Sequence, residues 1–152
     1  MTELEMKKYS RNALLGSFVS MLTAGLATMM YSVSISTIRT DLALTAVQAG
    51  SLGTYTFMGQ MLGGMVAGYL ADRYGRKNIL IVDVILATLA VFATSLLQSY
   101  SIFGILRFIT GVGLGGCYYI ASILIGEFVP TNKRGFMSGV ATSVWNFGYV
   151  VC

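Results

Sequence analysis

Long stretches almost without charge dominate this chain, and they restrict it to folds that a lipid bilayer can hold. Residues 42–71 carry no charged side chain, and only Asp83 interrupts the stretch between Lys77 and Arg107. Only 11% of all residues are charged, against about a quarter in soluble domains. Inside a bilayer every backbone polar group must be hydrogen-bonded within its own segment, which an α-helix achieves. We therefore expect an all-α integral membrane protein, folded as a multi-pass helical bundle.

A membrane-spanning helix needs about 20 predominantly apolar residues. Five segments reach or approach this length and are the expected spans: 13–37, 47–71, 79–97, 102–126 and 135–152. Residues 1–12 are expected to form a cytoplasmic N-terminal segment. The uncharged run after Arg11 is far longer than the apolar part of a signal peptide, so the first span is expected to be retained. The last segment stops at Cys152 without the polar or aromatic flank that ends most spans, which indicates a fragment of a longer chain.

The basic residues indicate the orientation of the spans. Eight lie before the first span, between the second and third, or between the fourth and fifth: Lys7, Lys8, Arg11, Arg73, Arg76, Lys77, Lys133 and Arg134. Loops on the opposite side hold Arg39 alone. Basic loops stay in the cytoplasm, so this bias predicts a cytoplasmic N-terminus in a cell membrane (plasma or inner). The basic residues follow the loops instead of forming one stripe, so no nucleic-acid partner is expected.

Several kinds of chemistry lack the residues that they need. Histidine is absent, which removes Ser/His and Cys/His nucleophiles and imidazole metal sites. Cys117 and Cys152 have neither disulfide-framework nor metal-ligand spacing. No lysine lies within a span to serve as the base of a serine–lysine dyad. We expect no enzyme, no catalytic residues, no metal and no cofactor.

Glycines recur at the small-xxx-small spacing that lets helix backbones approach closely. The pairs are Gly59/Gly63, Gly64/Gly68, Gly111/Gly115 and Gly135/Gly139. Generic helix packing explains this spacing. A second interpretation is that these helices also slide or rock against partners.

Two ionisable residues lie inside expected spans, where such residues are functional candidates. Asp83 is expected at the cytoplasmic level of its span, as are Arg76, Glu127 and Arg134. These four side chains either form an ion-paired cluster or extend singly to the membrane interface. Arg107 lies near the opposite face. It needs water, a carbonyl or a carboxylate as partner, unless it extends to the outer interface.

Two motifs now carry a resemblance to a known family. The first is Gly68-x-x-x-Asp72-Arg73-x-Gly75-Arg76-Lys77, and the second is Arg107-Phe-x-x-Gly111 followed by Glu127-Phe-Val-Pro130-Thr-x-x-Arg134-Gly135. In this order and on these loops they resemble the major facilitator superfamily of transporters, within its sugar-porter and related metabolite-porter branches. The resemblance implies the first five helices of twelve, in the N-terminal half of a transporter.

The resemblance also implies roles. Gly75 would permit the tight turn between the second and third spans, and Asp72 would face the N-terminal end of a helix in the missing C-terminal half. Arg76, Glu127 and Arg134 would form a charge network that closes the cytoplasmic side in one state and breaks in the other. Gly68, Arg73, Lys77 and Arg107 are further motif residues.

The implied function is secondary active transport, by alternating access, of a small organic solute such as an organic acid, sugar or related metabolite. Proton symport is expected, with Asp83 as a candidate coupling residue, although the first span lacks the aspartate of proton-coupled relatives. Candidate solute-facing residues are Tyr31, Ser34, Thr56, Gln60, Tyr118, Trp145 and Asn146, each of which could instead bond between helices. Five helices alone are not expected to transport. Drug efflux by the same superfamily and a non-transporting membrane interaction remnant remain the alternatives.

Overall fold

A computed structural model shows how these segments are arranged. It describes the backbone of residues 3–41, 43–96, 99–129 and 131–151, and the side chains of residues 11, 14–40, 43–94, 96, 99–129 and 131–147. This described part of the chain forms five α-helices: α1 (Glu3–Asp41), α2 (Ala46–Tyr74), α3 (Arg76–Leu96), α4 (Tyr100–Phe128) and α5 (Arg134–Val151). Each expected span lies within one helix, apart from residues 97 and 152, which fall outside the described residues. The chain thus has the all-α, multi-helix fold that its composition predicts.

The first helix extends beyond the expected first span. Residues 13–37 lie within α1, which already begins at Glu3. Charged side chains do not end a helix by themselves, because the helical hydrogen bonds lie in the backbone. The border between residues 12 and 13 is therefore a change of polarity within one helix and no structural boundary.

Three stretches of the described helices are long and apolar enough to cross a membrane: Leu14–Thr40, Arg76–Thr94 and Tyr100–Phe128. The helices α2 and α5 hold no such stretch among the described residues, and both contain many glycine, hydroxyl and amide residues. At 1.5 Å per residue they are still about 43 and 27 Å long, close to or above the thickness of a hydrocarbon core. Length alone therefore allows all five helices to span.

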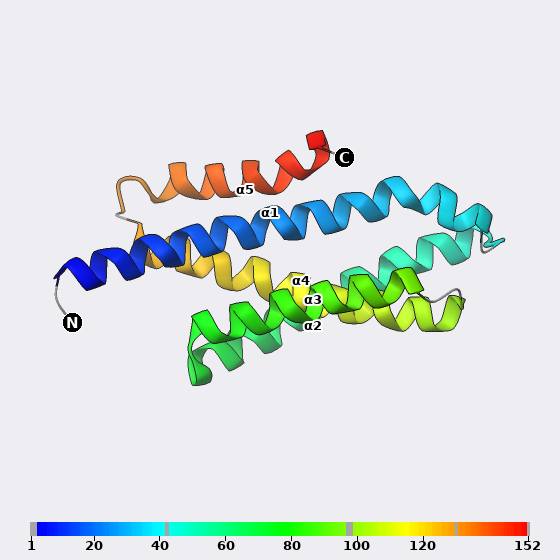
Figure 1. Ribbon diagram of the computed structural model, residues 1–152, viewed down its shortest axis with the longest axis horizontal. Coiled ribbons are helices and arrows are strands. Elements are labelled where there is room, and N and C mark those ends of the chain that lie inside the picture. Colours follow the sequence, from blue (N-terminus) through cyan, green and yellow to red (C-terminus); the bar gives the residue numbers. More distant parts are fainter. Residues whose placement is uncertain (1–2, 42, 97–98, 130, 152) are drawn as a thin grey trace.

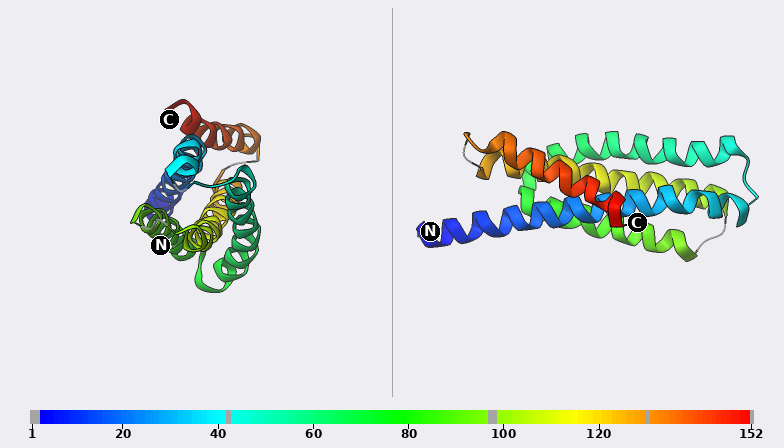
Figure 2. Two further views of the ribbon diagram at one scale, coloured as in Figure 1. Left: turned by 90° about the vertical axis from the view of Figure 1, so that its right-hand side faces the viewer. Right: turned by 90° about the horizontal axis from the view of Figure 1, so that it is seen from above.

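The five helices run along one common axis, with α4 in the middle (Figures 1 and 2). It packs against each of the other four helices, and α5 lies along α1. One end of the bundle holds the α2–α3 turn, the α4–α5 connection and the start of α1, as Figure 1 shows. The other end holds the α1–α2 and α3–α4 connections. The basic loops therefore gather at one end, as the charge pattern predicts.

Glycines bring α2 and α4 into backbone contact. A methyl group added at Gly59, Gly63, Gly111 or Gly115 would overlap a backbone carbonyl oxygen of the facing helix. This is the close approach that the small-xxx-small spacing predicts. By contrast, nothing described lies within 4 Å of a methyl group placed at Gly139 or at Gly135. Two glycine pairs thus form the α2–α4 seam, whereas the α5 pair has no packing role among the described residues.

A single glycine makes the turn between α2 and α3. Gly75 has φ of 90°, a value that side-chain-bearing residues rarely adopt. Its amide donates to the carbonyl oxygen of Ala71 and so closes the last turn of α2. One residue is therefore enough to connect the two helices. This is the tight turn predicted at this position.

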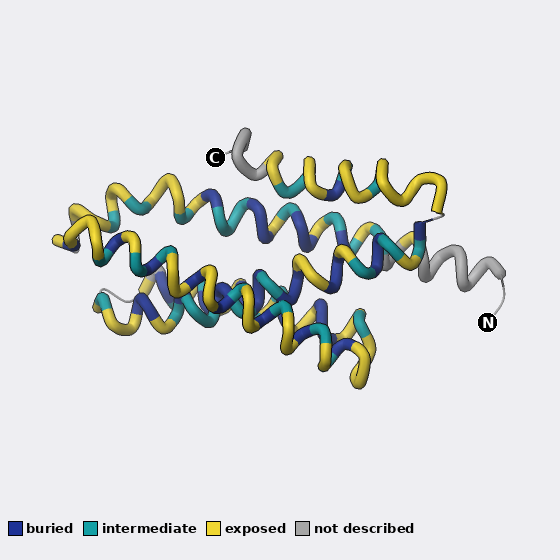
Figure 3. Tube along the Cα trace, turned by 180° about the vertical axis from the view of Figure 1, so that it is seen from behind, coloured by how far each residue is buried: buried dark blue, intermediate teal, exposed yellow. Residues whose placement is uncertain are grey.

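Exposed apolar side chains cover the outside of the bundle. The exposed residues run along the outer sides of the helices, whereas the buried ones face the interior (Figure 3). Among the exposed side chains are Phe57, Met61, Met65 and Leu89, with 61–69% of their surface accessible. Such a surface is unfavourable in water and suits contact with lipid or with further helices. The fold is that of an integral membrane protein, with α4 as its central helix.

Candidate functional site

Charged residues meet where α2 ends, α3 begins and α4 ends. Arg76, the first residue of α3, forms an ion pair with Glu127 near the end of α4. A second, longer contact of 3.7 Å joins Arg76 to Asp72 in the last turn of α2. The Arg76 side chain is 28% exposed, against 50% for Glu127 and 76% for Asp72. We call these three residues the inner cluster.

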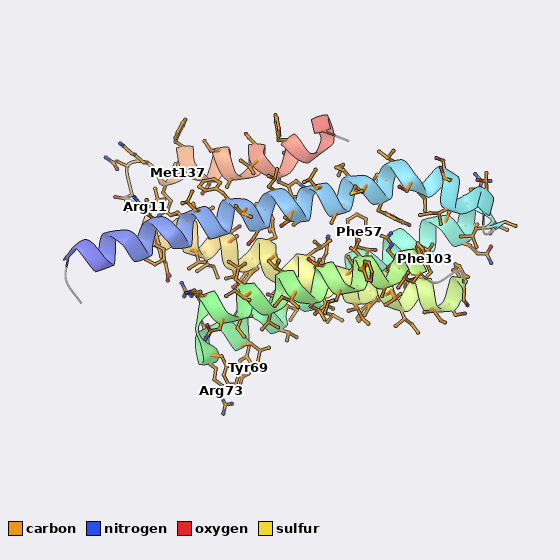
Figure 4. All side chains as sticks on the ribbon, viewed as in Figure 1. Arg11, Phe57, Tyr69, Arg73, Phe103 and Met137 are labelled. Carbon is orange, nitrogen blue, oxygen red and sulfur yellow. The ribbon has the colours of Figure 1, made fainter. Side chains whose placement is uncertain are left out.

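The inner cluster differs in membership from the network that the sequence suggested. Arg134 was expected to take part, but it is exposed and forms no ion pair with any side chain that the structure describes. Asp72 takes that place instead, because the one-residue turn holds the end of α2 against the start of α3. Of the other motif residues, Lys77 is exposed. The guanidinium carbon of Arg73 lies 5.8 Å from the ring centre of Tyr74, and the Arg73 side chain points away from the bundle (Figure 4). Gly68 faces the ring of Tyr119, which a methyl group there would approach to 2.8 Å.

Asp83 lies deep in the bundle, apart from the inner cluster. Only 7% of its surface is exposed, and its carboxyl group points at Gly116 in α4. Gly116 and Glu127 are eleven residues apart, or about 16 Å along the helix. The expected pairing of Asp83 with Arg76 and Glu127 is therefore wrong, because α3 presents Asp83 to the middle of α4.

Arg107 is also buried, near the other end of the bundle. Its guanidinium carbon lies 3.8 Å from the ring centre of Tyr31 in α1 and 5.2 Å from that of Phe103. With 8% of its surface exposed, Arg107 does not extend to the outer interface, so that alternative is wrong. Among the described residues its partner is an aromatic face instead of a carboxylate, and cation–π attraction provides the stabilisation.

Tyr31 connects three helices. Its ring lies under Arg107 of α4, and its hydroxyl donates a long hydrogen bond of 3.5 Å to the carbonyl oxygen of Ala49 in α2. The sequence placed Tyr31 among solute-facing candidates. In the structure it is half-buried and serves the contact between α1, α2 and α4. Sequence periodicity could not predict the contact between Tyr31 and Arg107, because the two residues lie 76 positions apart in the chain.

A groove of about 660 Å³ lies between α2, α4 and α5. Its lining consists of Phe57, Gln60, Met61, Gly64, Leu114, Gly115, Tyr118, Tyr119, Thr142, Trp145 and Asn146. We call it the α2–α4–α5 groove. The rings of Tyr118 and Trp145 meet edge to face there, with centres 5.4 Å apart and planes at 83°. Asn146 donates one amide hydrogen to the carbonyl oxygen of Thr142, at 2.9 Å.

Four of the seven solute-facing candidates line this groove: Gln60, Tyr118, Trp145 and Asn146. The remaining three do not. Thr56 is buried and donates its hydroxyl to Leu52 O at 3.1 Å, and Ser34 is exposed outside the groove. Sequence reasoning missed Phe57 and Thr142. Each lies three or four residues from a candidate on its own helix, and this spacing could have identified both.

The described residues offer no cluster of three or more His, Cys, Asp or Glu side chains that could hold a metal ion. Cys117 is buried in the contact between α2, α3 and α4, as a small packing residue. The groove presents aromatic faces and amide groups, and the inner cluster presents ion-paired side chains.

Comparison with known proteins identifies the family to which the chain belongs. Residues 17–152 match the Major Facilitator Superfamily. The chain is 34% identical over 139 residues to the cis,cis-muconate transport protein of Acinetobacter baylyi, covering 91% of this chain and 34% of that protein. It is 30% identical over 151 residues to the inner membrane metabolite transport protein YgcS of Escherichia coli, covering 99% and 34%. The niacin transporter NiaP of Acinetobacter baylyi is 33% identical over 117 residues, covering 77% and 27%. The chain thus spans about a third of the length of these relatives, which are named as transport proteins and not as enzymes. It belongs to the Major Facilitator Superfamily.

Proposed function

We propose that this chain provides five membrane-spanning helices of a secondary transporter for a small organic solute. The expected solute is an organic acid or a related metabolite. The spans are those expected from the sequence, in a cell membrane with the N-terminus in the cytoplasm. The α2–α4–α5 groove carries the proposal. Its volume of about 660 Å³ is in the usual range for small-ligand sites, roughly 300–1,000 Å³.

The lining of the groove suits a flat organic acid. The rings of Tyr118 and Trp145 offer apolar faces, and their edge-to-face contact fixes how they are presented. Gln60 and Asn146 add amide groups that can donate hydrogen bonds to a carboxylate. Asn146 uses one of its two amide hydrogens on Thr142, so the other remains for a solute. Cis,cis-muconate and niacin, in the names of two relatives, are small organic acids of this shape.

The inner cluster is proposed to be a gate. The ion pair between Arg76 and Glu127 links the start of α3 to the end of α4, and both side chains are partly exposed. A pair of this exposure contributes about 0–1 kcal/mol, so it can break and re-form during a transport cycle. Such a weak contact in one of two states is what alternating access requires. Asp72 keeps most of its surface free, and we propose that it faces the positive end of a helix outside these residues.

Further helices are part of the proposal. The relatives are about three times as long, and binding sites in secondary transporters lie between two helical halves. We propose that a second half covers the α2–α4–α5 groove and completes the solute site. Residues 1–152 alone are expected to give no uptake in liposomes. Proton symport is part of the same proposal.

Solute uptake by cells that produce the protein carrying these residues tests the proposal. Labelled cis,cis-muconate and niacin are the first probes. Replacing Trp145 with leucine removes an aromatic face worth about 0.5–1.5 kcal/mol, so KM should rise about two- to tenfold. Phe147→Leu is the matched control, since Phe147 is exposed on the same helix but outside the groove lining. Extrusion of drugs without metabolite uptake would favour the efflux alternative. An unchanged KM in Trp145→Leu would remove the groove as the solute site.

A further inference from the structure

Asp83 is a buried acid that neither the solute groove nor the inner cluster uses. It lies where α3 packs against α4, with 7% of its surface exposed. Its Oδ2 atom has no hydrogen-bond partner among the described residues. The carboxyl group fits against Gly116, where even a methyl group would overlap it. A carboxylate anion without hydrogen bonds is strongly unfavourable in such a place.

The neighbours of Asp83 do not neutralise a negative charge. From α4 the titratable neighbour is Cys117, a buried thiol. From α2 the neighbour is Ala67, whose methyl group and the Asp83 carboxyl group both lie beside Gly116. These side chains belong to an apolar cluster shared by α2, α3 and α4.

Charged groups on the adjoining helices lie farther away. On α3 itself the nearest cations along the axis are Lys77, six residues or about 9 Å away and exposed, and Arg76, about 10 Å away, where it pairs with Glu127. Across the groove between α1 and α3, α1 presents the uncharged residues Ser20 and Thr23. Asp83 thus has no counter-ion on any helix packed around it, among the described side chains.

A proton is the ligand that this site can hold. Calcium and magnesium ions take six or more oxygen ligands, and Asp83 is a single carboxyl group outside any cluster of metal-binding side chains in the described part of the chain. Protonation removes the charge without needing another ligand. We propose that Asp83 binds a proton in the α3–α4 contact, and that α3 packs on α4 in the observed way only while that proton is bound.

Release of the proton would move α3. The carboxylate would have to leave the Gly116 notch for water or for the side chain of Arg76, and the α3–α4 contact would open. Since Arg76 and Glu127 lie at the end of this contact, proton release would also weaken the inner cluster. This last step, a link between the proton and the gate, rests on the proposed transport function. Proton binding itself does not.

Infrared spectroscopy of the purified protein in lipid nanodiscs tests proton binding directly. The chain has six side-chain carboxyl groups: Glu3, Glu5, Asp41, Asp72, Asp83 and Glu127. A carbonyl stretching band of a protonated carboxyl group should persist at neutral pH and vanish in Asp83→Asn. It should remain in Asp72→Asn, whose parent side chain is 76% exposed. Absence of the band from the native protein, or its survival in Asp83→Asn, would overturn the proposal.

Thermal unfolding gives a second readout that needs no transport. The folded chain holds a proton that the unfolded chain releases, so the unfolding temperature should fall as the pH rises from mildly acidic to mildly alkaline. Asp83→Asn should flatten this dependence. Gly116→Ala, which fills the notch, should also weaken the infrared band. Gly126→Ala, on the same helix with nothing within 4 Å of the added methyl group, should leave it unchanged.

The two proposals can fail separately. In the full-length protein that carries these residues, a band assigned to Asp83 without measurable uptake would keep the proton site and reject the transport function. Uptake without the band would reject the proton site and keep the transport function. An unfolding temperature whose pH dependence is the same in Asp83→Asn as in the native protein would contradict proton binding in either case.

Discussion

Replacing Gly63 with alanine should separate α2 from α4. The added methyl group would overlap the carbonyl oxygen of Val112 and would lie 2.6 Å from its Cα atom. Ordinary contacts begin near 3.4 Å, so the methyl group is about 0.8 Å too close. The atoms that it meets belong to the backbone of α4, and no side chain can rotate away to make room. The two helices must therefore move apart along the whole seam.

The cost follows from this geometry. Overpacking of a well-packed interior typically destabilises by about 1–3 kcal/mol. Separation along the seam also loosens the contacts at Gly59, Gly111 and Gly115, so we expect the upper half of that range, about 2–3 kcal/mol. In a chain of this size one kcal/mol corresponds to roughly 2–4 °C. The unfolding temperature of Gly63→Ala should fall by about 4–12 °C.

Gly53→Ala is the matched control, because Gly53 lies on the same helix and nothing is within 4 Å of its added methyl group. Alanine favours a helix over glycine by about 1 kcal/mol, so this variant should unfold at the native temperature or above. Circular dichroism in detergent measures both variants under the same conditions. If Gly63→Ala unfolds within about 1 °C of Gly53→Ala, the backbone contact of α2 with α4 is not the one described here.

Three further outcomes are expected. Tyr31→Leu removes the ring under Arg107 and should lower the free energy of unfolding by about 1–2 kcal/mol. Tyr31→Phe keeps the ring and should lower it by less than half as much. Equal losses in the two variants would contradict the cation–π contact. Gly75→Ala should lose about 1–3 kcal/mol in thermal unfolding because alanine disfavours the positive φ of this residue, and an unchanged stability would contradict this turn geometry. Glu127→Gln should slow solute uptake while changing the unfolding free energy by less than about 1 kcal/mol; an unchanged uptake rate would contradict the gate.

The positions of the helices could be predicted from the sequence, because the bilayer and the backbone impose them. Runs without charge and of sufficient length must be helical in lipid, and the tight turn needs the conformational freedom of Gly75. Glycine spacing likewise predicted close backbone approach, which the structure shows between α2 and α4. The spacing alone did not tell which pairs meet, since Gly135 and Gly139 have the same spacing and contact nothing described.

The pairing of Arg76 with Glu127 was predicted from the motif resemblance and is present. The other side-chain partners could not be predicted, because they depend on how each helix is rotated about its axis. Asp83 was expected at the cytoplasmic level with Arg76 and Glu127, but it lies deeper in the bundle and faces Gly116. Seven residues make almost two turns of a helix, so Asp83 and Arg76 share one side of α3 but meet different parts of α4. The contact of Tyr31 with Arg107 depends on three helices at once. An isolated helix carries no information about such a contact.

Neighbouring residues of α4 contact both the proton site at Asp83 and the α2–α4–α5 groove. Gly116 meets the carboxyl group of Asp83 on the α3 side, whereas Tyr118 lines the α2–α4–α5 groove with Trp145. Successive residues of an α-helix point about 100° apart, so residues 116 and 118 face nearly opposite sides of one rigid backbone. Opening of the α3–α4 contact after release of the proton from Asp83 shifts α4 relative to α3, and Tyr118 moves with α4. The proton site and the solute groove can therefore influence each other through a single turn of helix, without any direct contact between proton and solute.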